Sequence, residues 1–395
     1  MYIADLSEKG GDHLAVSRKN ERDDQLNWRY QDKSYNELFK KWRKQSKDSH
    51  GFYYVDKSNE LTYRDGYGFV KNYPEAAESN ALRHVYSIIG VTMLLIAAVD
   101  IIRLYISPLI LSRLGADVYY DYFTGEFYGN EWLITLMYLF FELFKRFLPL
   151  MYCYKKLKMP LKVMIPTNIN NRPLFRAAIP ISLLASGVCI ALSAIYKVIL
   201  GNAGLDSMQG IHLPKDPVVF AVAIIINVAI IPVASEIYTR GTIMQLLRQF
   251  GDGFAIIVTS VLTAMAAYDI KQFCYVFVTS VVIGYFTLRT GSVITAVVMR
   301  IVSKAFIYLV YCLDEYIGGE LSGILIMMLL FLSIMTGLMV LVGFMRKHSD
   351  KLGMSLKPRY LSLSRKALSA LTNIPVVIGT TVMIIITIIN IKFNL

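Results

Sequence analysis

The sequence predicts an all-α fold, a polytopic bundle of about nine transmembrane helices preceded by an N-terminal cytoplasmic extension. Hydrophobic residues make up 55% of the 395 residues, charged residues make up 18%, and the mean hydropathy is +0.46. This composition is too apolar for an ordinary soluble domain. The apolar residues form blocks of about 20, long enough to cross the ~30 Å hydrocarbon layer as helices. The blocks are continuously apolar, whereas the strands of a membrane barrel alternate apolar and polar residues.

Nine apolar blocks are expected to span the membrane. They are Tyr86–Tyr105, Trp132–Cys153, Leu174–Ile199, Val218–Tyr238, Phe254–Tyr268, Phe273–Leu288, Val293–Leu313, Leu321–Phe344 and Ile374–Ile391. The fifth and sixth blocks are short for a complete crossing, so we expect them to be tilted, stretched by their neighbours or partly re-entrant.

The distribution of lysine and arginine predicts the orientation of the chain, because loops rich in these residues stay on the cytoplasmic side. Cations concentrate between the second and third spans and between the eighth and ninth, at Lys155, Lys156, Lys158, Lys162, Arg172, Arg176, Arg346, Lys347, Lys351, Lys357, Arg359, Arg365 and Lys366. The opposite loops are acidic, with Asp117, Asp121, Glu126, Glu131, Asp314, Glu315 and Glu320. We therefore expect an integral membrane protein with a cytoplasmic N-terminus and an external C-terminus.

The net charge of +12 is attributed to this topology and to contact of the basic loops with anionic lipid headgroups. We do not expect this positive charge to bind nucleic acid. The lipid bilayer is therefore the expected environment.

The extension before the first span contains one segment with helical amphipathicity. Tyr35, Leu38, Phe39 and Trp42 recur at helical spacing, with lysine and arginine on the other face. Such a helix either lies on the inner leaflet or packs on its own protein. Two short apolar runs follow, Phe52–Val55 and Leu61–Tyr63, and are expected to pair as a hairpin around Ser58–Asn59.

The four cysteines lie within or at the edges of apolar blocks and have no C-x-x-C spacing, so they are interpreted as small apolar residues. They are Cys153, Cys189, Cys274 and Cys312. No cofactor and no metal site is expected from this sequence.

Residues from about 218 to 306 carry two polar patterns inside the apolar blocks. The first is Ser235-Glu236-Ile237-Tyr238-Thr239-Arg240, and the second is Arg289-Thr290-Gly291-Ser292, followed by Arg300 and Lys304. Pro232 precedes the first pattern and Gly284 precedes the second. These residues resemble the CPBP family (CAAX protease and bacteriocin-processing, Abi-type) of intramembrane proteases. In that family the motifs are Glu-Glu-x-x-x-Arg, Phe-x-x-x-His and His-x-x-x-Asn or Asp.

The resemblance implies a CPBP-like core in which most catalytic positions have changed. Glu236 and Arg240 are retained, Ser235 replaces the first glutamate, Arg300 occupies the histidine position of the third motif, and Lys304 occupies its asparagine position. For the second motif, the resemblance implies Tyr268 at the histidine position and Ala264 at the phenylalanine position. Family members are thought to use the glutamate and the histidines to activate water and stabilise an oxyanion, with a proposed role for metal.

These assignments divide the chain into four parts: an extension (1–85), N-terminal transmembrane helices (86–200), the CPBP-like core (201–313) and C-terminal transmembrane helices with a basic cytoplasmic loop (314–395). The family also implies the cytoplasmic membrane of a bacterium as the location.

The five histidines, His13, His50, His84, His212 and His348, are all expected outside the apolar spans, so none replaces the missing catalytic histidines. Arg300 can donate hydrogen bonds but cannot act as a base, because its pKa stays above about 12. Glu236 with Arg240, and Arg300 with Lys304, each share one helix face. Two interpretations follow: a buried ion-pair cluster in which Glu236 pairs with Arg300 or Lys304, or a polar cavity that still binds a peptide or a lipid headgroup. An excess of positive charge also favours a lipid phosphate or an acidic segment entering from the cytoplasm as counter-ion.

Two further charged groups lie inside the first and second spans, Asp100 with Arg103, and Glu142 with Lys145 and Arg146. They are interpreted as paired or reaching to the interface.

Three classes of function are consistent with these patterns. The first is a non-catalytic, CPBP-like pseudoprotease that acts as a scaffold, chaperone or regulator of a membrane-protein or peptide partner. The second is an active intramembrane endopeptidase that uses Glu236 in an altered constellation. The third is a transporter or channel, although no inverted repeat with broken helices is evident.

Overall fold

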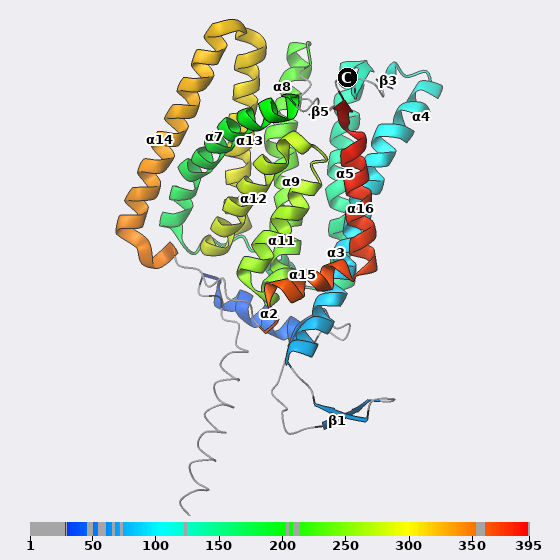
Figure 1. Ribbon diagram of the computed structural model, residues 1–395, viewed down its shortest axis with the longest axis vertical. Coiled ribbons are helices and arrows are strands. Elements are labelled where there is room, and N and C mark those ends of the chain that lie inside the picture. The colour runs from blue at the N-terminus through cyan, green and yellow to red at the C-terminus, as the bar shows by residue number, and fades with distance from the viewer. Residues whose placement is uncertain are drawn as a thin grey trace, which may run out of the picture.

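The computed structural model describes residues 28, 30–45, 50–53, 61–64, 68–71, 74–121, 125–202, 205–207, 214–352 and 360–393. The described chain is a bundle of long helices with very little strand, as predicted from the sequence (Figure 1). The helices before the core are α2 (Lys33–Gln45), α3 (Pro74–Ile101), η1 (Ile102–Ile106), α4 (Ser107–Arg113), α5 (Glu131–Leu157), α6 (Leu161–Met164) and α7 (Arg172–Asn202).

The helices of the core and the C-terminal part follow. They are α8 (Pro217–Ile225), η2 (Ile226–Ile230), α9 (Ile231–Glu236), η3 (Ile237–Ile243), α10 (Met244–Leu247), η4 (Arg248–Phe250), α11 (Asp252–Met265), α12 (Ile270–Thr290), α13 (Val293–Ile317), α14 (Gly319–Leu352), α15 (Leu363–Leu371) and α16 (Ile374–Ile389). Residues 217–250 run without a break as one helical segment.

Six helices in the described residues are long and apolar enough to cross a membrane, or seven if the bent pair α15–α16 is one span. Each of the nine predicted blocks nevertheless falls largely in helix, although the fifth block extends past the end of α11 at Met265 and the ninth extends past the end of α16 at Ile389. The lower count has physical causes. Helix α5 carries Glu142, Lys145 and Arg146 within its apolar stretch, α11 has only 14 residues, and α16 follows α15 after a bend of 79°. The first span also begins earlier than predicted, because α3 starts at Pro74.

The two ends of the bundle have different coverings. The α2 end carries α2 and α15, whereas the opposite end carries the C-terminus, the β3–β4 hairpin and the α13–α14 turn (Figure 1). Strands β3 (Val118–Asp121) and β4 (Glu126–Gly129) are antiparallel, as are β5 (Leu205–Ser207) and β6 (Ile391–Phe393). The pairing of β5 with β6 joins the end of α7 to the end of α16.

The hairpin in the extension uses a different partner from the one expected. Strand β1 (Leu61–Arg64) pairs with β2 (Gly68–Lys71), the segment that follows it. Phe52 is instead buried against Phe250 and Tyr360. The expected turn at Ser58–Asn59 lies outside the described residues.

Helix α2 packs on the protein itself. Its aromatic residues Tyr35, Phe39 and Trp42 are buried, and Trp42 Nε1 donates a hydrogen bond of 2.8 Å to the carbonyl oxygen of Leu157. The hydroxyl of Tyr35 donates a hydrogen bond of 2.6 Å to Gln245 Oε1, and burial raises the pKa of Tyr35 to about 12. The sequence left two positions open for this helix, on the inner leaflet or on the protein itself. The structure has the second, because the apolar face of α2 covers the end of the bundle.

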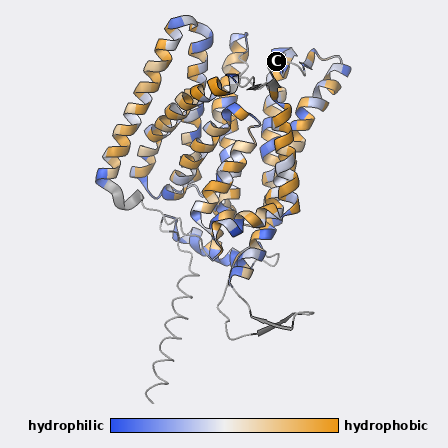
Figure 2. Cartoon of the chain, viewed as in Figure 1, coloured by the Kyte–Doolittle hydropathy of each residue, from blue (hydrophilic) through white to orange (hydrophobic). Residues whose placement is uncertain are grey.

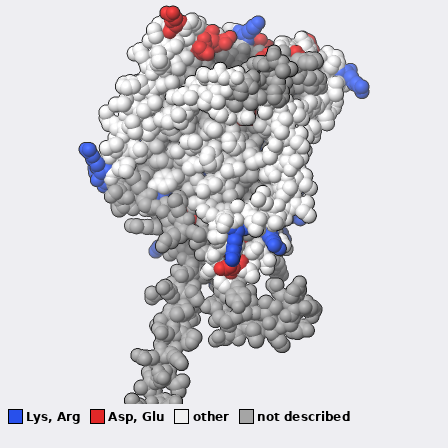
Figure 3. All heavy atoms as spheres, in the orientation of Figure 1, with Lys and Arg blue, Asp and Glu red and all other residues white. Residues whose placement is uncertain are grey.

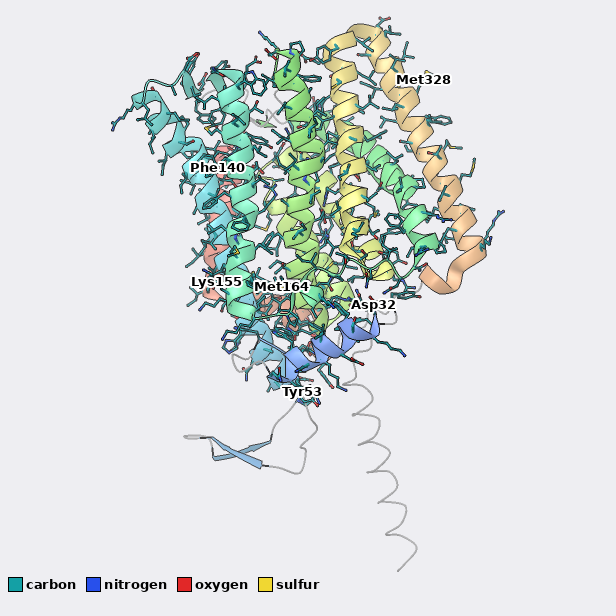
Figure 4. The ribbon with its side chains drawn as sticks, turned by 180° about the vertical axis from the view of Figure 1, so that it is seen from behind. Asp32, Tyr53, Phe140, Lys155, Met164 and Met328 are labelled. Carbon is teal, nitrogen blue, oxygen red and sulfur yellow. The ribbon has the colours of Figure 1, made fainter. Side chains whose placement is uncertain are left out.

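The outer surfaces of the bundle are apolar, and hydrophilic residues lie mostly at the two ends (Figure 2). Helix α14 exposes Met327, Met328, Phe331 and Met339, and Met328 and Phe140 project outward from opposite sides of the bundle (Figure 4). Contiguous apolar surface of this extent suits a lipid bilayer. On the face shown in Figure 3, acidic side chains gather at the end opposite α2.

Candidate functional site

The first motif lies on the 217–250 segment, which contains two π-helical stretches. The first, η2, ends two residues before Pro232, which has no N–H to donate and crowds the carbonyl four residues earlier, so a wider turn relieves the helix. The second, η3, begins directly after Glu236 and contains Arg240. Wide turns of this kind are frequent at functional sites.

Glu236 forms the centre of a buried ion cluster with Arg240 and Arg300. Its side chain is completely buried. Oε1 accepts a hydrogen bond of 2.7 Å from Arg300 Nε, and Oε2 lies 3.5 Å from Arg240 Nε. The cluster therefore joins two helices, because Arg300 lies on α13, and one carboxylate faces two guanidinium groups.

The remaining guanidinium nitrogens of this Glu236 cluster are held by hydroxyl and carbonyl oxygens. Arg240 Nη1 donates to Thr259 Oγ1 at 2.5 Å, and Arg240 Nη2 donates to the Ser280 carbonyl oxygen at 2.8 Å. Arg300 Nη2 donates to Ser280 Oγ at 2.8 Å. Ser280 thus contacts both arginines, and helices α11 and α12 complete the shell. The sequence reasoning missed Thr259 and Ser280, because a hydroxyl residue in an apolar helix carries little signal by itself.

Gly284 permits the close packing of this shell. A Cβ at Gly284 would lie 3.2 Å from Ile256 Cγ2 and 3.7 Å from Arg240 Cζ. A larger side chain at this position would displace α11 or the guanidinium group.

A cavity of about 1030 Å³ lies beside the Glu236 cluster. Ser235, Arg300 and Lys304 line its wall. Glu236 and Arg240 are not among the lining residues, so these two residues of the first pattern lie behind the wall. Glu236, Arg240 and Arg300 therefore come together, but the Glu236 carboxylate does not reach the cavity.

The cavity extends towards the end opposite α2. Its lining there includes Phe127 of β4, Lys215 before α8 and Asp314 near the end of α13. The α2 end is covered instead, since Lys366 Nζ donates to the Phe250 carbonyl oxygen and α2 packs on α10. The expected entry of a counter-ion from the cytoplasm stays a prediction.

Tyr268 lines the same cavity but lies away from the Glu236 cluster. It follows the end of α11 in a left-handed backbone conformation with φ of 49°. Its ring lies 4.9 Å from Lys145 Nζ, and its hydroxyl faces Asp100. Ala264 is buried and is not among the lining residues. Among the described residues, Thr259 rather than Tyr268 is the α11 side chain that contacts the cluster.

Five charged residues of α3, η1 and α5 form a second cluster, the Asp100 cluster, and four of them line the same cavity: Arg103, Glu142, Lys145 and Arg146. Lys145 Nζ lies 2.5 Å from Asp100 Oδ2, Arg103 Nε lies 3.6 Å from Asp100 Oδ1, and Arg146 donates to the Glu142 carboxylate. The expected pairing of these charges is observed. We did not predict from the sequence that four of these residues line the same cavity. Their spacing of three and four residues inside apolar spans places them on one helix face and could have indicated a shared polar site.

The Arg289-Thr290-Gly291-Ser292 segment is a turn between α12 and α13 that anchors the extension. Gly291 has φ of 78°, and a Cβ there would lie 2.1 Å from the Tyr30 carbonyl oxygen. Ser292 Oγ donates to the Thr167 carbonyl oxygen at 2.8 Å, and the Arg289 guanidinium lies 4.2 Å from the centre of the Tyr30 ring. This segment fixes the start of α13 and therefore the position of Arg300 along the axis of the bundle.

The residues at the site do not suit a metal ion. No histidine is among the lining residues that the structure describes; His50 and His84 lie near each other at the α2 end, and His13 and His212 are outside the described ranges. No group of three or more His, Cys, Asp or Glu side chains is placed to hold a metal within the described chain. The motif positions on α13 hold Arg300 and Lys304, and both side chains are donors without a free acceptor.

Comparison with protein families gives one match, over residues 217–306, to the family model described as type II CAAX prenyl endopeptidase Rce1-like. The predicted family resemblance is confirmed over this segment. The Rce1-like segment covers roughly a quarter of the chain and contains Glu236, Arg240, Arg300 and Lys304. Comparisons with curated proteins and with solved structures give no match. The chain is thus an integral membrane protein with a protease-like segment, and the Asp100 cluster lies outside that segment.

Proposed function

We propose that the protein is a non-catalytic, protease-like membrane protein that uses its cavity to bind a partner within the membrane. The observation that carries the proposal is the engagement of the buried Glu236 carboxylate by Arg300 and Arg240. A carboxylate that activates water must reach that water. Glu236 does not line the cavity, whereas its partner Arg300 does.

The chemistry of the other motif positions supports the same proposal. Activation of water and protonation of a leaving amine require a group that exchanges protons near neutral pH. Arg300 and Lys304 stand where the family has histidine and asparagine, and arginine remains protonated throughout the physiological range. Arg300 retains the ability to bind an anion, so binding is the function that its geometry supports.

In this proposal the protein is a scaffold, chaperone or regulator of a membrane-protein or peptide partner, and nucleic acid is not a partner. The α2 end, with the basic loops, faces the cytoplasm, and the C-terminus lies outside. The basic loops at the α2 end contact anionic lipid headgroups.

A hydrolysis assay tests the proposal. Purified full-length protein is incubated with a prenylated CAAX peptide and with membrane-protein substrates, and the products are followed by mass spectrometry. We expect no cleavage by the wild type or by Glu236→Gln. Cleavage that disappears in Glu236→Gln but persists in the matched variant Glu315→Gln, at the mouth of the cavity, would establish the active-protease alternative.

A further inference from the structure

Lys304 is a cation in the cavity wall whose charge is not balanced by the protein around it. It lies one helical turn after Arg300 on α13 and lines the cavity. Within the described part of the chain, it makes no hydrogen bond or ion pair. Its electrostatic neighbours are two cations, Arg300 and Arg146, and one carboxylate, Glu142.

The carboxylates near Lys304 already have partners. Glu236 is paired with Arg300 and Arg240, Glu142 is paired with Arg146, and Asp100 is paired with Lys145 and Arg103. Together, the two clusters and Lys304 contain six cations and three carboxylates. Charge inside a membrane is expensive unless it is paired or hydrated, so an excess of positive charge favours a bound anion.

Part of the cavity wall is apolar. It is formed by side chains of α3, η1, α7, α11 and α13, including Met93, Ile96, Leu104, Ile190, Leu262 and Ile307. A cavity of about 1030 Å³ has the size of a site for a substantial organic ligand. Cations on one part of the wall and apolar side chains on another part suit a molecule with an anionic head and a hydrocarbon chain.

We propose that the cavity binds a phosphate-bearing amphiphile, with the phosphate at Lys304 between Arg300 and Arg146 and the hydrocarbon chain along the apolar wall. A phosphate group has enough oxygens to accept from all three cations, and arginine and lysine are its usual ligands in proteins. The inference rests on the proposed function, because it assigns the ligand of the same cavity.

The test uses the purified full-length protein in a neutral detergent. Dioctanoyl phosphatidic acid is titrated in and the heat of binding is recorded, with inorganic phosphate and dioctanoylglycerol as the two comparison ligands. We expect saturable binding of the phosphatidic acid with one molecule per protein, inorganic phosphate weaker by at least about tenfold, and no binding of dioctanoylglycerol. Equal affinity for inorganic phosphate and phosphatidic acid, or binding of dioctanoylglycerol, overturns the assignment of a phosphate-bearing amphiphile.

Variants locate the site. Lys304→Met should weaken phosphatidic acid binding by roughly tenfold or more, and Lys304→Arg should restore most of it. The matched control Lys162→Met, at an exposed lysine of the α2 end, should bind as the wild type does. Wild-type affinity in Lys304→Met, or an equal loss in Lys162→Met, contradicts the proposed position. Thermal unfolding of Lys304→Met at or above the wild-type temperature shows that a loss of binding is not a loss of folding.

The two proposals fail in different ways. If the protein neither binds phosphatidic acid nor cleaves peptides, the ligand assignment is wrong and the non-catalytic function still stands. Cleavage by a protein that also binds phosphatidic acid refutes the non-catalytic function and leaves the ligand site.

Discussion

Glu236 and Arg300 lie 64 residues apart in the chain, yet Glu236 Oε1 accepts a hydrogen bond of 2.7 Å from Arg300 Nε in the interior of the bundle. In the proposed non-catalytic function, Arg300 stands where the family motif has a histidine, and a permanent cation replaces a neutral imidazole. The ion pair ties the 217–250 segment to α13.

The geometry of Arg300 predicts that a positive charge at this position is not enough to stabilise the Glu236 cluster and that the guanidinium shape is also needed. Arg300→Lys should lower the free energy of unfolding by ~1–3 kcal/mol, because a single ammonium group cannot reach both Glu236 and Ser280 Oγ. The converse change one turn later, Lys304→Arg, should have an effect within ~0.5 kcal/mol, because Lys304 faces the cavity. Denaturation of both variants in mixed detergent measures the difference, and equal stability of Arg300→Lys and wild type would disprove the two-contact geometry.

Helix α2 is expected to contribute to the stability of the bundle. Trp42→Ala should lower the free energy of unfolding by ~3–5 kcal/mol, because it removes a buried ring and the hydrogen bond to Leu157. Lys41→Ala, on the exposed face of the same helix, should have little effect. A small effect of both substitutions would instead indicate a helix that rests on the lipid surface.

The turn between α12 and α13 should tolerate only glycine at position 291. Gly291→Ala should lower the free energy of unfolding by ~1–3 kcal/mol, because the backbone is left-handed there and the new Cβ meets the Tyr30 carbonyl. Gly343→Ala, in α14 where a Cβ meets nothing within 4 Å, should stabilise the protein by ~0.5–1 kcal/mol. Thermal unfolding of the pair measures the contrast, and an equal response of the two variants would rule out this role of Gly291.

Orientation in the membrane can be measured with single cysteines in a background that lacks the four native ones. Lys162→Cys, at the α2 end, should react with an impermeant maleimide only after the membrane is opened. Glu320→Cys, at the opposite end, should react in intact cells. The reverse pattern would place the basic loops outside.

The helices and the pairing of Glu236 were predictable because they depend on local properties of the chain. Continuous apolar runs predict membrane helices whatever their neighbours, and the balance of charge on two helix faces predicted that Glu236 meets Arg300 or Lys304. The structure selects Arg300. Lys304 remains in the cavity wall.

Contacts between distant segments were not predictable in the same way. The pairing of Asp100 with Lys145 depends on the rotation of α3 against α5, which no pattern in either helix reports. The position of Tyr268 depends on where α11 ends, and α11 stops at Met265, so the residue leaves the helix face that reaches Arg240. The strand that begins at Leu61 pairs with the segment that follows it, Gly68–Lys71, because a shorter loop closes at a lower entropic cost.

A double-mutant cycle on Glu236 and Arg300 tests the central claim most directly. Glu236→Ala alone should cost ~3–5 kcal/mol, since it leaves Arg300 and Arg240 buried without their anion. Adding Arg300→Met should recover ~1–3 kcal/mol relative to the sum of the two single effects, whereas the control combination of Glu236→Ala with Arg365→Met, at the exposed α2 end, should be additive. The account predicts this coupling between Glu236 and Arg300; a double mutant whose loss of stability equals the simple sum would contradict it.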